Sequence, residues 1–313
     1  MKTIVLEKAG GVENLKIQEI EKPTIKETEV LIEVKAISIN PADAKVKYAE
    51  EGLKMLLGKT TDVILGWDVS GTVVSVGEKV SKFKIGDNVF GMVNFPGVGN
   101  AYAEFVASPE SHLALMPTNI SFEEAAATTL AALTALQILQ GKVKKDDKVL
   151  LQAGSGGVGH FAIQIAKQMG AFVITTSSAK NKDYVLSIGA NEHIDYRAQA
   201  FDEVLSGLDF VFDTQGGEIL EKALKVVKPN GTIITTAAMQ IEEDLQAKAD
   251  TLKVNVFSML VQSNSKDMNT LKEMLENETI KPTIYKTFPF EAMGEAHTEI
   301  EAGRTVGKVV VTL

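Results

Sequence analysis

The sequence predicts an α/β protein in which a doubly wound, six-stranded parallel sheet domain is inserted into a mostly β domain. Three observations carry this prediction. A glycine-rich turn joins a short apolar run to a helical pattern within residues 149–171. Strand and helix patterns then alternate as far as residue 257, which is typical of a parallel sheet with helices on both faces. Short strands separated by turn residues occupy the first hundred residues and recur near the C-terminus.

Length, composition and charge exclude several classes of protein. A chain of 313 residues suggests about two domains, and 45% hydrophobic with 23% charged residues is the mix of a globular protein. The net charge of −9 disfavours nucleic acid and anionic membranes, because phosphate binding needs clustered Lys and Arg. No run of about 18 apolar residues and no signal peptide is present, so we expect a cytoplasmic protein. The absence of Cys excludes disulfides, thiolate nucleophiles and Cys-ligated zinc.

The first domain is expected to be mostly β. Its strand patterns are apolar or alternating and are separated by Gly, Pro and charged turns. The pattern at 69–76 is β-branched and interrupted by Gly71, which suits a bent barrel strand. The expected strands are 3–6, 15–20, 30–39, 69–76, 88–93 and 102–107.

The second domain is expected over residues 121–264. Ser121 and Glu124 form a capping box that opens a long helix rich in Ala and Leu. Six strands follow, the number in a full dinucleotide-binding (Rossmann) domain. These strands are 148–152, 171–176, 192–195, 209–213, 231–236 and 253–257, with helices that include 157–169, 181–188 and 217–227. The tail adds a helix (266–277), a strand (284–288), a helix (291–302) and a strand (308–312). These are too few for a third domain, so 265–313 are expected to complete the domain of residues 1–120.

The turn Gly154-x-Gly156-x-x-Gly159, with Gly157 and Val158 between the last two, matches the dinucleotide fingerprint. The first glycine allows a tight turn, the second a close approach of the pyrophosphate, and the third close packing of helix on strand. The helix N-terminus supplies free N–H groups for the phosphates. The alternative is a glycine-rich turn without a ligand, but its position between a strand and a helix favours a cofactor.

The end of the second strand of this domain indicates NADP(H) rather than NAD. An NAD site usually has an acidic residue about 20 positions after the turn, bonded to the ribose. Here residues 175–182 contain hydroxyls and two lysines, with no carboxylate before Asp183. Hydroxyl donors and ammonium groups suit a 2′-phosphate. Ser178 also fits a helix N-cap with the lysines in solvent, and the two interpretations are compatible.

Several short motifs give the chain a family resemblance. In order they are Ser38–Lys45, Gly66–Val73, Phe83–Gly91, Ala101–Phe105, the glycine turn, Phe212–Thr214 and Gly303–Lys308. With these motifs, essentially the whole chain resembles the zinc-independent medium-chain dehydrogenases/reductases, in the branch of zeta-crystallin-like quinone oxidoreductases and alkenal/enone reductases. The resemblance implies a GroES-like domain, a Rossmann domain and no catalytic zinc. The four histidines (112, 160, 193 and 297) are scattered, and His160 fits an ordinary helix residue.

By this resemblance, Asn40 and Lys45 face the nicotinamide and the substrate. Asn40 either donates to a substrate carbonyl or positions the nicotinamide ribose. Lys45 either stabilises developing enolate charge or relays a proton. The alternative for Lys45 is a solvated helix residue beside Lys47, and Tyr48 is a second candidate donor.

The resemblance also implies cofactor contacts beyond the glycine turn. Thr134 would lie near the nicotinamide, Tyr196 beside the adenosine, and Arg304 near the phosphates. For the threonines, hydrogen bonding at strand ends is the alternative. The residues implied are Thr134, Ser177, Ser178 and Lys182 (the last three at the 2′-phosphate), Tyr196, Asp213, Thr214, Thr236, Ala237 and Arg304.

The expected function is NADPH-dependent hydride transfer to a quinone or to the C=C of an α,β-unsaturated carbonyl, in a cleft between the domains. The alternatives are a 2-enoyl thioester reductase and a non-catalytic NADP(H)-binding scaffold or sensor. A homodimer is implied by the resemblance, with 254–259 as an apolar edge strand, unless that strand is covered. The helix-like segment 49–59 departs from many relatives and is expected to line or cover the cleft.

Overall fold

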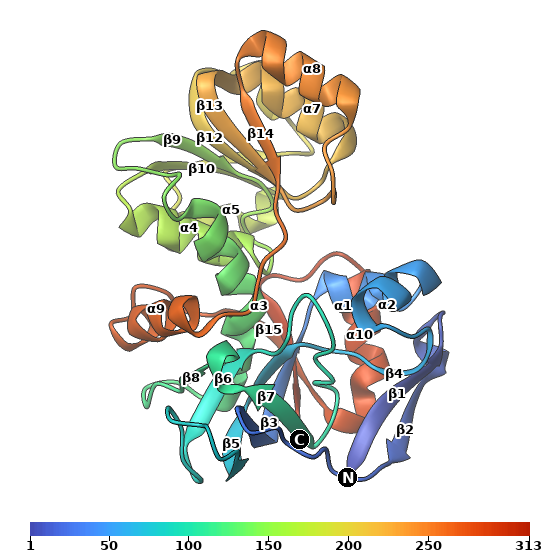
Figure 1. Cartoon of the computed structure of the whole chain (residues 1–313). Helices are drawn as coiled ribbons and strands as arrows, with labels where there is room; N and C mark the ends of the chain where they lie inside the picture. Colours follow the sequence, from blue (N-terminus) through green and yellow to red (C-terminus); the bar gives the residue numbers. More distant parts are fainter. The chain divides into compact units, whose positions relative to one another are not determined.

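The computed structural model describes all 313 residues and divides into two compact units (Figure 1). Unit 1 comprises Met1–Leu133 and Val261–Leu313, and unit 2 comprises Thr134–Leu260. The first boundary lies within helix α3 (Phe122–Leu139) rather than before it, where the sequence suggested a division. Unit 1 has two sheets and unit 2 has one, and each unit has its own buried residues.

Unit 1 contains the two antiparallel-rich sheets. The larger one has strand order β15-β16-β3-β5-β6-β8, and β7 also pairs with β3. The smaller one has the order β2-β1-β4. The strands are β1 (Lys2–Lys8), β2 (Leu15–Glu19), β3 (Glu29–Ile39), β4 (Thr61–Ile64), β5 (Asp68–Val76), β6 (Asn88–Met92), β7 (Phe105–Pro109), β8 (Leu113–Leu115), β15 (Ile284–Pro289) and β16 (Lys308–Thr312). The short strands β4 and β8 were not predicted from the sequence.

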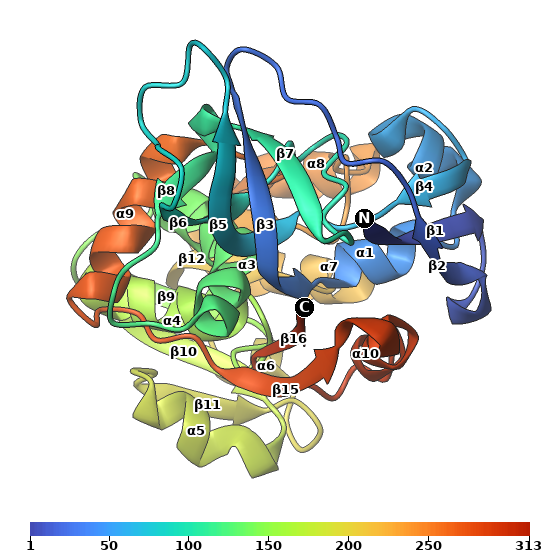
Figure 2. The ribbon, with the colours of Figure 1, turned by 90° about the horizontal axis from the view of Figure 1, so that it is seen from below.

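The C-terminal strands return to the sheet of the first residues. β16 pairs antiparallel with β3, with Val309 opposite Ile39, and β15 pairs parallel with β16 (Figure 2). β5 pairs antiparallel with the other edge of β3, with Asp68 opposite Ser38. The end of β3 therefore lies between the starts of β5 and β16, and this arrangement positions the polar cluster described below.

Helices of unit 1 follow local sequence signals. The predicted capping box of α3 is confirmed: Ser121 N–H donates to Glu124 Oε2 (2.9 Å), and Glu124 N–H donates to Ser121 Oγ (3.2 Å). The segment expected to be helix-like forms α2 (Glu50–Leu57). Small residues on the first turns of α3 pack against the sheet at Ala36 and Val310. The other helices are α1 (Pro41–Val46), α9 (Ser265–Glu276) and α10 (Met293–Glu301).

Unit 2 is the predicted doubly wound domain. Its six strands are all parallel and have the order β11-β10-β9-β12-β13-β14, the order of a Rossmann sheet. They are β9 (Lys148–Leu151), β10 (Phe172–Ser177), β11 (Glu192–Asp195), β12 (Leu208–Asp213), β13 (Val227–Thr235) and β14 (Asn255–Ser258). The helices, besides the end of α3, are α4 (Gly159–Gln168), α5 (Lys182–Ser187), α6 (Phe201–Val204), α7 (Gly217–Val226) and α8 (Glu243–Leu252). β14 is an edge strand, and no helix of the chain is long and apolar enough to cross a bilayer.

Candidate active site

The glycine turn of unit 2 requires glycine at its two ends. A Cβ on Gly154 would lie 2.0 Å from Thr175 Oγ1, and a Cβ on Gly159 would lie 2.2 Å from the carbonyl oxygen of Ala153. Contacts this short do not occur between real atoms, so the tight turn and the close packing of α4 both depend on the missing side chains. At Gly156 a Cβ would lie 3.2 Å from Ala153 O, a contact that is tight but less severe than those at Gly154 and Gly159.

The start of α4 presents unused hydrogen-bond donors. The N–H groups of Gly157, Val158 and Gly159 donate no hydrogen bond to any backbone carbonyl. Consecutive free N–H groups at a helix N-terminus, with the positive end of the helix dipole, form a site for an anion. The turn therefore fits the pyrophosphate of a dinucleotide.

The residues expected to bind the 2′-phosphate lie between the end of β10 and the start of α5. They differ in exposure and in hydrogen bonding. Ser177 is buried, and its hydroxyl lies 2.8 Å from His193 Nε2 on the neighbouring strand β11. Ser178 is at the N-cap position of a short 3-10 turn, but its hydroxyl makes no capping hydrogen bond. Lys182 is exposed and its ammonium makes no ion pair. Lys182 is thus free to bind an anion. The Ser178 hydroxyl has no hydrogen-bond partner but is buried (7% exposed), and Ser177 already has a partner that the sequence did not reveal.

Asp213, expected near the cofactor, holds the turn after β12. Its carboxylate accepts hydrogen bonds from the N–H of Gly216 (3.0 Å) and from the hydroxyl of Thr235 on β13 (2.6 Å). The side chain is fully buried. These contacts give Asp213 a structural role at the carboxyl edge of the sheet, where open α/β sheets bind ligands.

The other residues expected to bind the cofactor in unit 2 differ in exposure. Thr134 is buried on α3, and Thr214 is half-buried and accepts from the Gln215 amide at 3.1 Å. Tyr196 is 57% exposed, and the Arg197 guanidinium lies over its ring at 5.5 Å from the centroid. Thr236 and Ala237, which follow β13, are also exposed.

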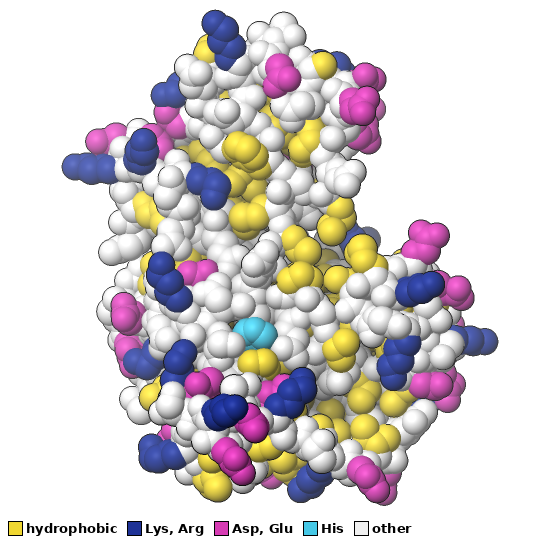
Figure 3. All heavy atoms as spheres, in the orientation of Figure 1, with side chains coloured by type: hydrophobic (Ala, Val, Ile, Leu, Met, Phe, Trp, Pro, Cys, Tyr) yellow, Lys and Arg dark blue, Asp and Glu magenta, His cyan; other side chains and the backbone are white.

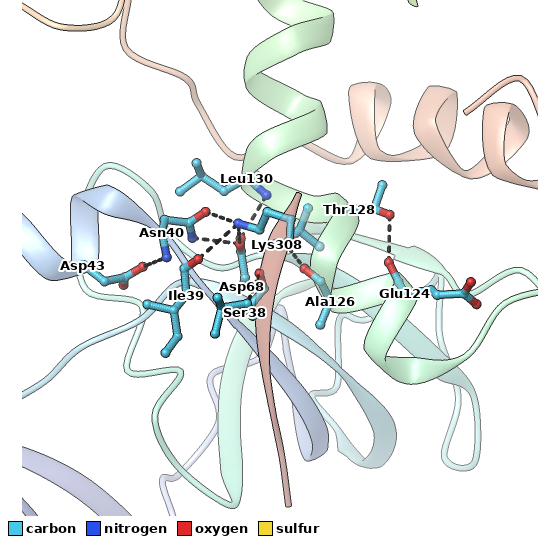
Figure 4. Close-up of polar contacts among 12 residues, drawn as sticks. Ser38, Ile39, Asn40, Asp43, Asp68, Glu124, Ala126, Thr128, Leu130 and Lys308 are labelled. Carbon is cyan, nitrogen blue, oxygen red and sulfur yellow. Dashed lines mark hydrogen bonds and ion pairs between the residues drawn. The ribbon is translucent and has the colours of Figure 1, made fainter. Parts of the chain in front are cut away.

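Asn40 of unit 1 is almost completely buried and its carboxamide is held on both sides (Figure 4). Its Nδ2 donates to Asp68 Oδ2 at 2.8 Å, and the Lys308 ammonium donates to its Oδ1. The Asn40 backbone N–H donates to Asp43 Oδ2 at 2.7 Å and so begins α1. Asn40, Asp68 and Lys308 are brought together from three elements.

Asp68 and Lys308 form a buried ion pair. Lys308 Nζ lies 3.7 Å from Asp68 Oδ2 and donates to the Ile39 carbonyl at 3.3 Å. Asp68 Oδ1 accepts the backbone N–H of Leu130 in α3 at 2.9 Å. Burial raises the pKa of Asp68 and lowers that of Lys308, while the charge of each partner acts in the opposite direction. Because donors surround Asp68, the carboxylate is the form that these contacts fit.

Asp43 is a second buried carboxyl group in the same cluster. Its Oδ1 has no hydrogen-bond partner. Burial, together with the nearby Asp68, raises the pKa of Asp43 to about 7. One ammonium group therefore faces two carboxyl groups, and Asp43 is the one that retains its proton below neutral pH.

Tyr102 and His297 extend this cluster. The Tyr102 hydroxyl lies 2.9 Å from His297 Nε2, and burial followed by the charges of Asp43 and Asp68 raises the pKa of Tyr102 well above its ordinary value. Burial and the neighbouring Lys47 lower the pKa of His297 to about 3, so the imidazole is neutral. No spacing in the sequence relates these residues, and only the folded chain places them together.

The two candidate proton donors, Lys45 in α1 and Tyr48 just after it, differ in their contacts. Lys45 is exposed and its ammonium makes no hydrogen bond or ion pair. Tyr48 is 54% exposed, and its hydroxyl donates to Glu301 Oε2 at 3.2 Å. Lys47, by contrast, is fully buried and pairs with Glu301. Lys45 is therefore the lysine in this region that is available to a ligand.

Arg304, between α10 and β16, is also exposed and has no ion pair.

Comparisons with known proteins agree with this architecture. Residues 26–118 match the family described as "Alcohol dehydrogenase GroES-like domain", and residues 188–311 match "Zinc-binding dehydrogenase". Despite the second description, no group of three or more His, Cys, Asp or Glu side chains in this chain is arranged to hold a metal ion.

Individual relatives are similar over nearly the whole chain. The 2-methylene-furan-3-one reductase of Solanum lycopersicum is 34% identical over 317 residues, which cover 96% of this chain and 76% of that protein. The NADPH-dependent alkenal/one oxidoreductase of Arabidopsis thaliana is 33% identical, covering 99% and 79%. The solved quinone oxidoreductase of Coxiella burnetii is 32% identical with a TM-score of 0.92, covering 100% and 99%. The Escherichia coli quinone oxidoreductase solved with NADPH is 26% identical with a TM-score of 0.89 over all of both chains. The two matched domains, the Rossmann sheet and these relatives together show that the chain belongs to the medium-chain dehydrogenase/reductase family.

Proposed function

We propose that this chain is an NADPH-dependent oxidoreductase that transfers hydride, without zinc, to the C=C of an α,β-unsaturated carbonyl or to a quinone. The observation that carries the proposal is the turn of unit 2, where three consecutive N–H groups are free at the start of α4. Relatives at 33% and 34% identity are named for reduction of alkenals, enones and a methylene-furanone. A bound NADPH would supply the hydride.

Unit 2 supplies the groups that would hold the cofactor. The N–H groups of Gly157, Val158 and Gly159 would bind the pyrophosphate. The Ser178 hydroxyl and the Lys182 ammonium, both without partners, would bind the 2′-phosphate. Residues 175–182 contain no carboxylate that would repel the added charge.

Unit 1 supplies the groups proposed to act on the substrate. Hydride addition to the β-carbon of an enone places negative charge on the carbonyl oxygen. The Lys45 ammonium has no other partner and would stabilise that charge or deliver the proton that completes the reaction. Asn40 would offer its amide N–H to the carbonyl or to the nicotinamide ribose.

A thioester reductase is the second candidate, because the CurK enoyl reductase has the same fold with a TM-score of 0.91 and 26% identity. Such an enzyme must accept a charged carrier or nucleotide. On the face drawn in Figure 3, Lys and Arg are intermingled with Asp and Glu rather than gathered into a patch. This distribution gives the thioester the weaker case.

We also propose a cytoplasmic homodimer. β14 is one of the two edge strands of the unit 2 sheet, and its Phe257 is 51% exposed. An apolar edge strand is suited to pairing with a second copy across the edge. Sedimentation at two protein concentrations, repeated with Phe257→Lys, tests this assembly: a monomeric wild-type chain would refute it.

NADPH consumption by the purified chain tests the catalytic proposal. A short alkenal, a simple quinone and a short enoyl thioester are compared, with NADH as the control donor. The proposal expects turnover of the alkenal or the quinone, with NADPH preferred over NADH. Turnover of the thioester alone would select the second candidate. Binding of NADPH without turnover of any substrate would select the non-catalytic alternative.

A further inference from the structure

The carboxamide of Asn40 contacts one group that can only donate and one that can only accept. The Lys308 ammonium faces Oδ1, and the Asp68 carboxylate faces Nδ2 (Figure 4). We propose that Asp68 and Lys308 are positioning residues that determine which way the Asn40 carboxamide faces. This inference rests on the proposed function, in which Asn40 contacts the ligand.

The argument comes from the chemistry of the three side chains. An ammonium group has no acceptor, and an ionised carboxylate has no donor, whereas an amide has one edge of each kind. Rotating the amide by 180° would place Nδ2 against the ammonium of Lys308 and Oδ1 against the carboxylate of Asp68. Both contacts would be repulsive, and burial prevents water from relieving them. Only one orientation is therefore compatible with this pair.

The fixed orientation determines what Asn40 offers to a ligand. One hydrogen of Nδ2 is bonded to Asp68, and the other is on the side of the neighbouring Asp43 carboxyl group, with which the Asn40 side chain also interacts. Oδ1 is taken by Lys308. The group that Asn40 can share with a ligand is therefore this second N–H, which is suited to a carbonyl or hydroxyl oxygen. Without the pair, Asn40 could equally present its oxygen, which would repel a substrate carbonyl.

The fold builds this arrangement from strand register. Val309 is opposite Ile39, so Lys308 is beside Asn40, and Asp68 is opposite Ser38 on the other side of β3. The Leu130 N–H holds the second oxygen of Asp68, so the carboxylate is itself fixed. All of these residues belong to unit 1.

A buried ion pair is weak evidence for stability, because apolar residues of similar size often stabilise a fold equally well. Its arrangement around an amide indicates a role in orientation.

A double-mutant cycle separates positioning from support of the fold. Asp68→Asn keeps the volume of the side chain but introduces both a donor and an acceptor, so only Lys308 still orients the Asn40 amide. We expect kcat/KM for the best substrate to fall about tenfold in the wild-type background, and by less than about twofold in the Asn40→Ala background. An equal loss in both backgrounds would overturn the proposal.

Ser70→Ala is the matched control for this cycle. Ser70 is buried on the same strand as Asp68, and its hydroxyl donates to the Phe122 carbonyl at 2.6 Å without touching Asn40. Its effect on kcat/KM should be the same factor in both backgrounds. If Ser70→Ala shows the same background dependence as Asp68→Asn, the coupling is not specific to Asn40 and the proposal is wrong.

Variants of Lys308 test the other side of the amide. Lys308→Arg keeps a cation that only donates and should retain kcat/KM within about threefold, whereas Lys308→Met should lose about tenfold or more. Folding of both is checked by circular dichroism. If Lys308→Met does not fold, the Lys308→Arg variant and the Asp68→Asn cycle still test the positioning proposal. An Arg variant that folds but is as impaired as Asp68→Asn would contradict the proposal.

Nitrogen-15 NMR of the side-chain amides measures the orientation without turnover. The Asn40 resonances are assigned by their loss in Asn40→Asp. In the wild-type chain one of the two amide protons, bonded to Asp68, should be shifted downfield of the other, and Asp68→Asn should remove that separation. Unchanged resonances would overturn the positioning role even in an active enzyme. A wild-type chain with the expected resonances but no reductase activity would refute the proposed function alone.

Discussion

The Tyr102 hydroxyl lies 2.9 Å from Nε2 of His297, which is 195 residues further along the chain, and both side chains are buried in unit 1. Asp43 is close enough for its charge to raise the pKa of Tyr102. In the folded chain the pKa of Asp43 is about 7 and that of His297 about 3, compared with ordinary values of 3.8 and 6.5. Near pH 5 the unfolded chain thus has a charged Asp43 and a charged His297, whereas the folded chain buries both in neutral form.

Replacing His297 by Gln should reveal the pH dependence that Asp43 confers. Because the folded pKa of Asp43 is raised, its contribution to stability is complete below pH 3.8 and is lost as pH rises towards 7. The free energy of unfolding of His297→Gln should therefore fall by roughly 1 kcal/mol per pH unit between pH 4 and 6.5, relative to wild type. Urea unfolding at pH 4.5, 5.5 and 6.5 measures this slope. A variant whose slope matches wild type would show that the two groups are not linked in this way.

Replacing Asp43 by Asn should produce the opposite slope. Asn imitates the protonated carboxyl group, so little stability should be lost at pH 7. The folded pKa of His297 is lowered, so its contribution is present above pH 6.5 and is lost as pH falls towards 3. Without Asp43 to offset it, acid should destabilise the variant by roughly 1 kcal/mol per pH unit below 6.5. Lys47, Lys308 and Asp68 also face these groups and are unchanged in both variants. A variant as resistant to acid as wild type would contradict the prediction.

Replacing Lys182 by Ala should weaken the binding of NADPH without changing that of NADH. Loss of a charge-assisted contact to the 2′-phosphate should raise the Kd for NADPH about tenfold. This increase should be smaller at high salt, because salt screens the charges. Lys180→Ala is the matched control, because Lys180 is also exposed and belongs to the same loop. Quenching of cofactor fluorescence measures both constants. If Lys180→Ala has the larger effect, the phosphate is held by the other lysine.

Replacing Lys45 by Met should lower kcat about 10- to 100-fold with little change in the Kd for NADPH, because a stabilising charge near the carbonyl oxygen is lost. The stability of the variant should match wild type, because Lys45 is exposed and unpaired. Lys54→Met, at an exposed position on α2, provides the control. Steady-state rates with the best substrate and urea unfolding check both expectations. Full activity in Lys45→Met would leave the exposed Tyr48 as the candidate donor.

Local patterns predicted most of the fold. The glycine turn, the capping box at Ser121 and the alternation of strands with helices in unit 2 each depend on residues close together in the chain. The strands β4 (Thr61–Ile64) and β8 (Leu113–Leu115) are short and lie outside the strand–helix alternation that revealed the four-residue strands of unit 2, so no pattern marked them. They form because neighbouring strands provide partners for their backbone groups.

Lys45 of α1 and Lys47, which follows this helix, show what only the tertiary structure decided. Lys45 and Lys47 are two positions apart and therefore point to different sides of the helix, but nothing local indicates which side is covered. The fold buries Lys47 against Glu301 and leaves Lys45 exposed. In the same way, the sequence by itself determined that a dinucleotide turn starts at Gly154. The partners of Asn40 were decided by the register of β16 and β5 on β3, because a buried charge is stabilised by whichever opposite charge the packed strands bring beside it.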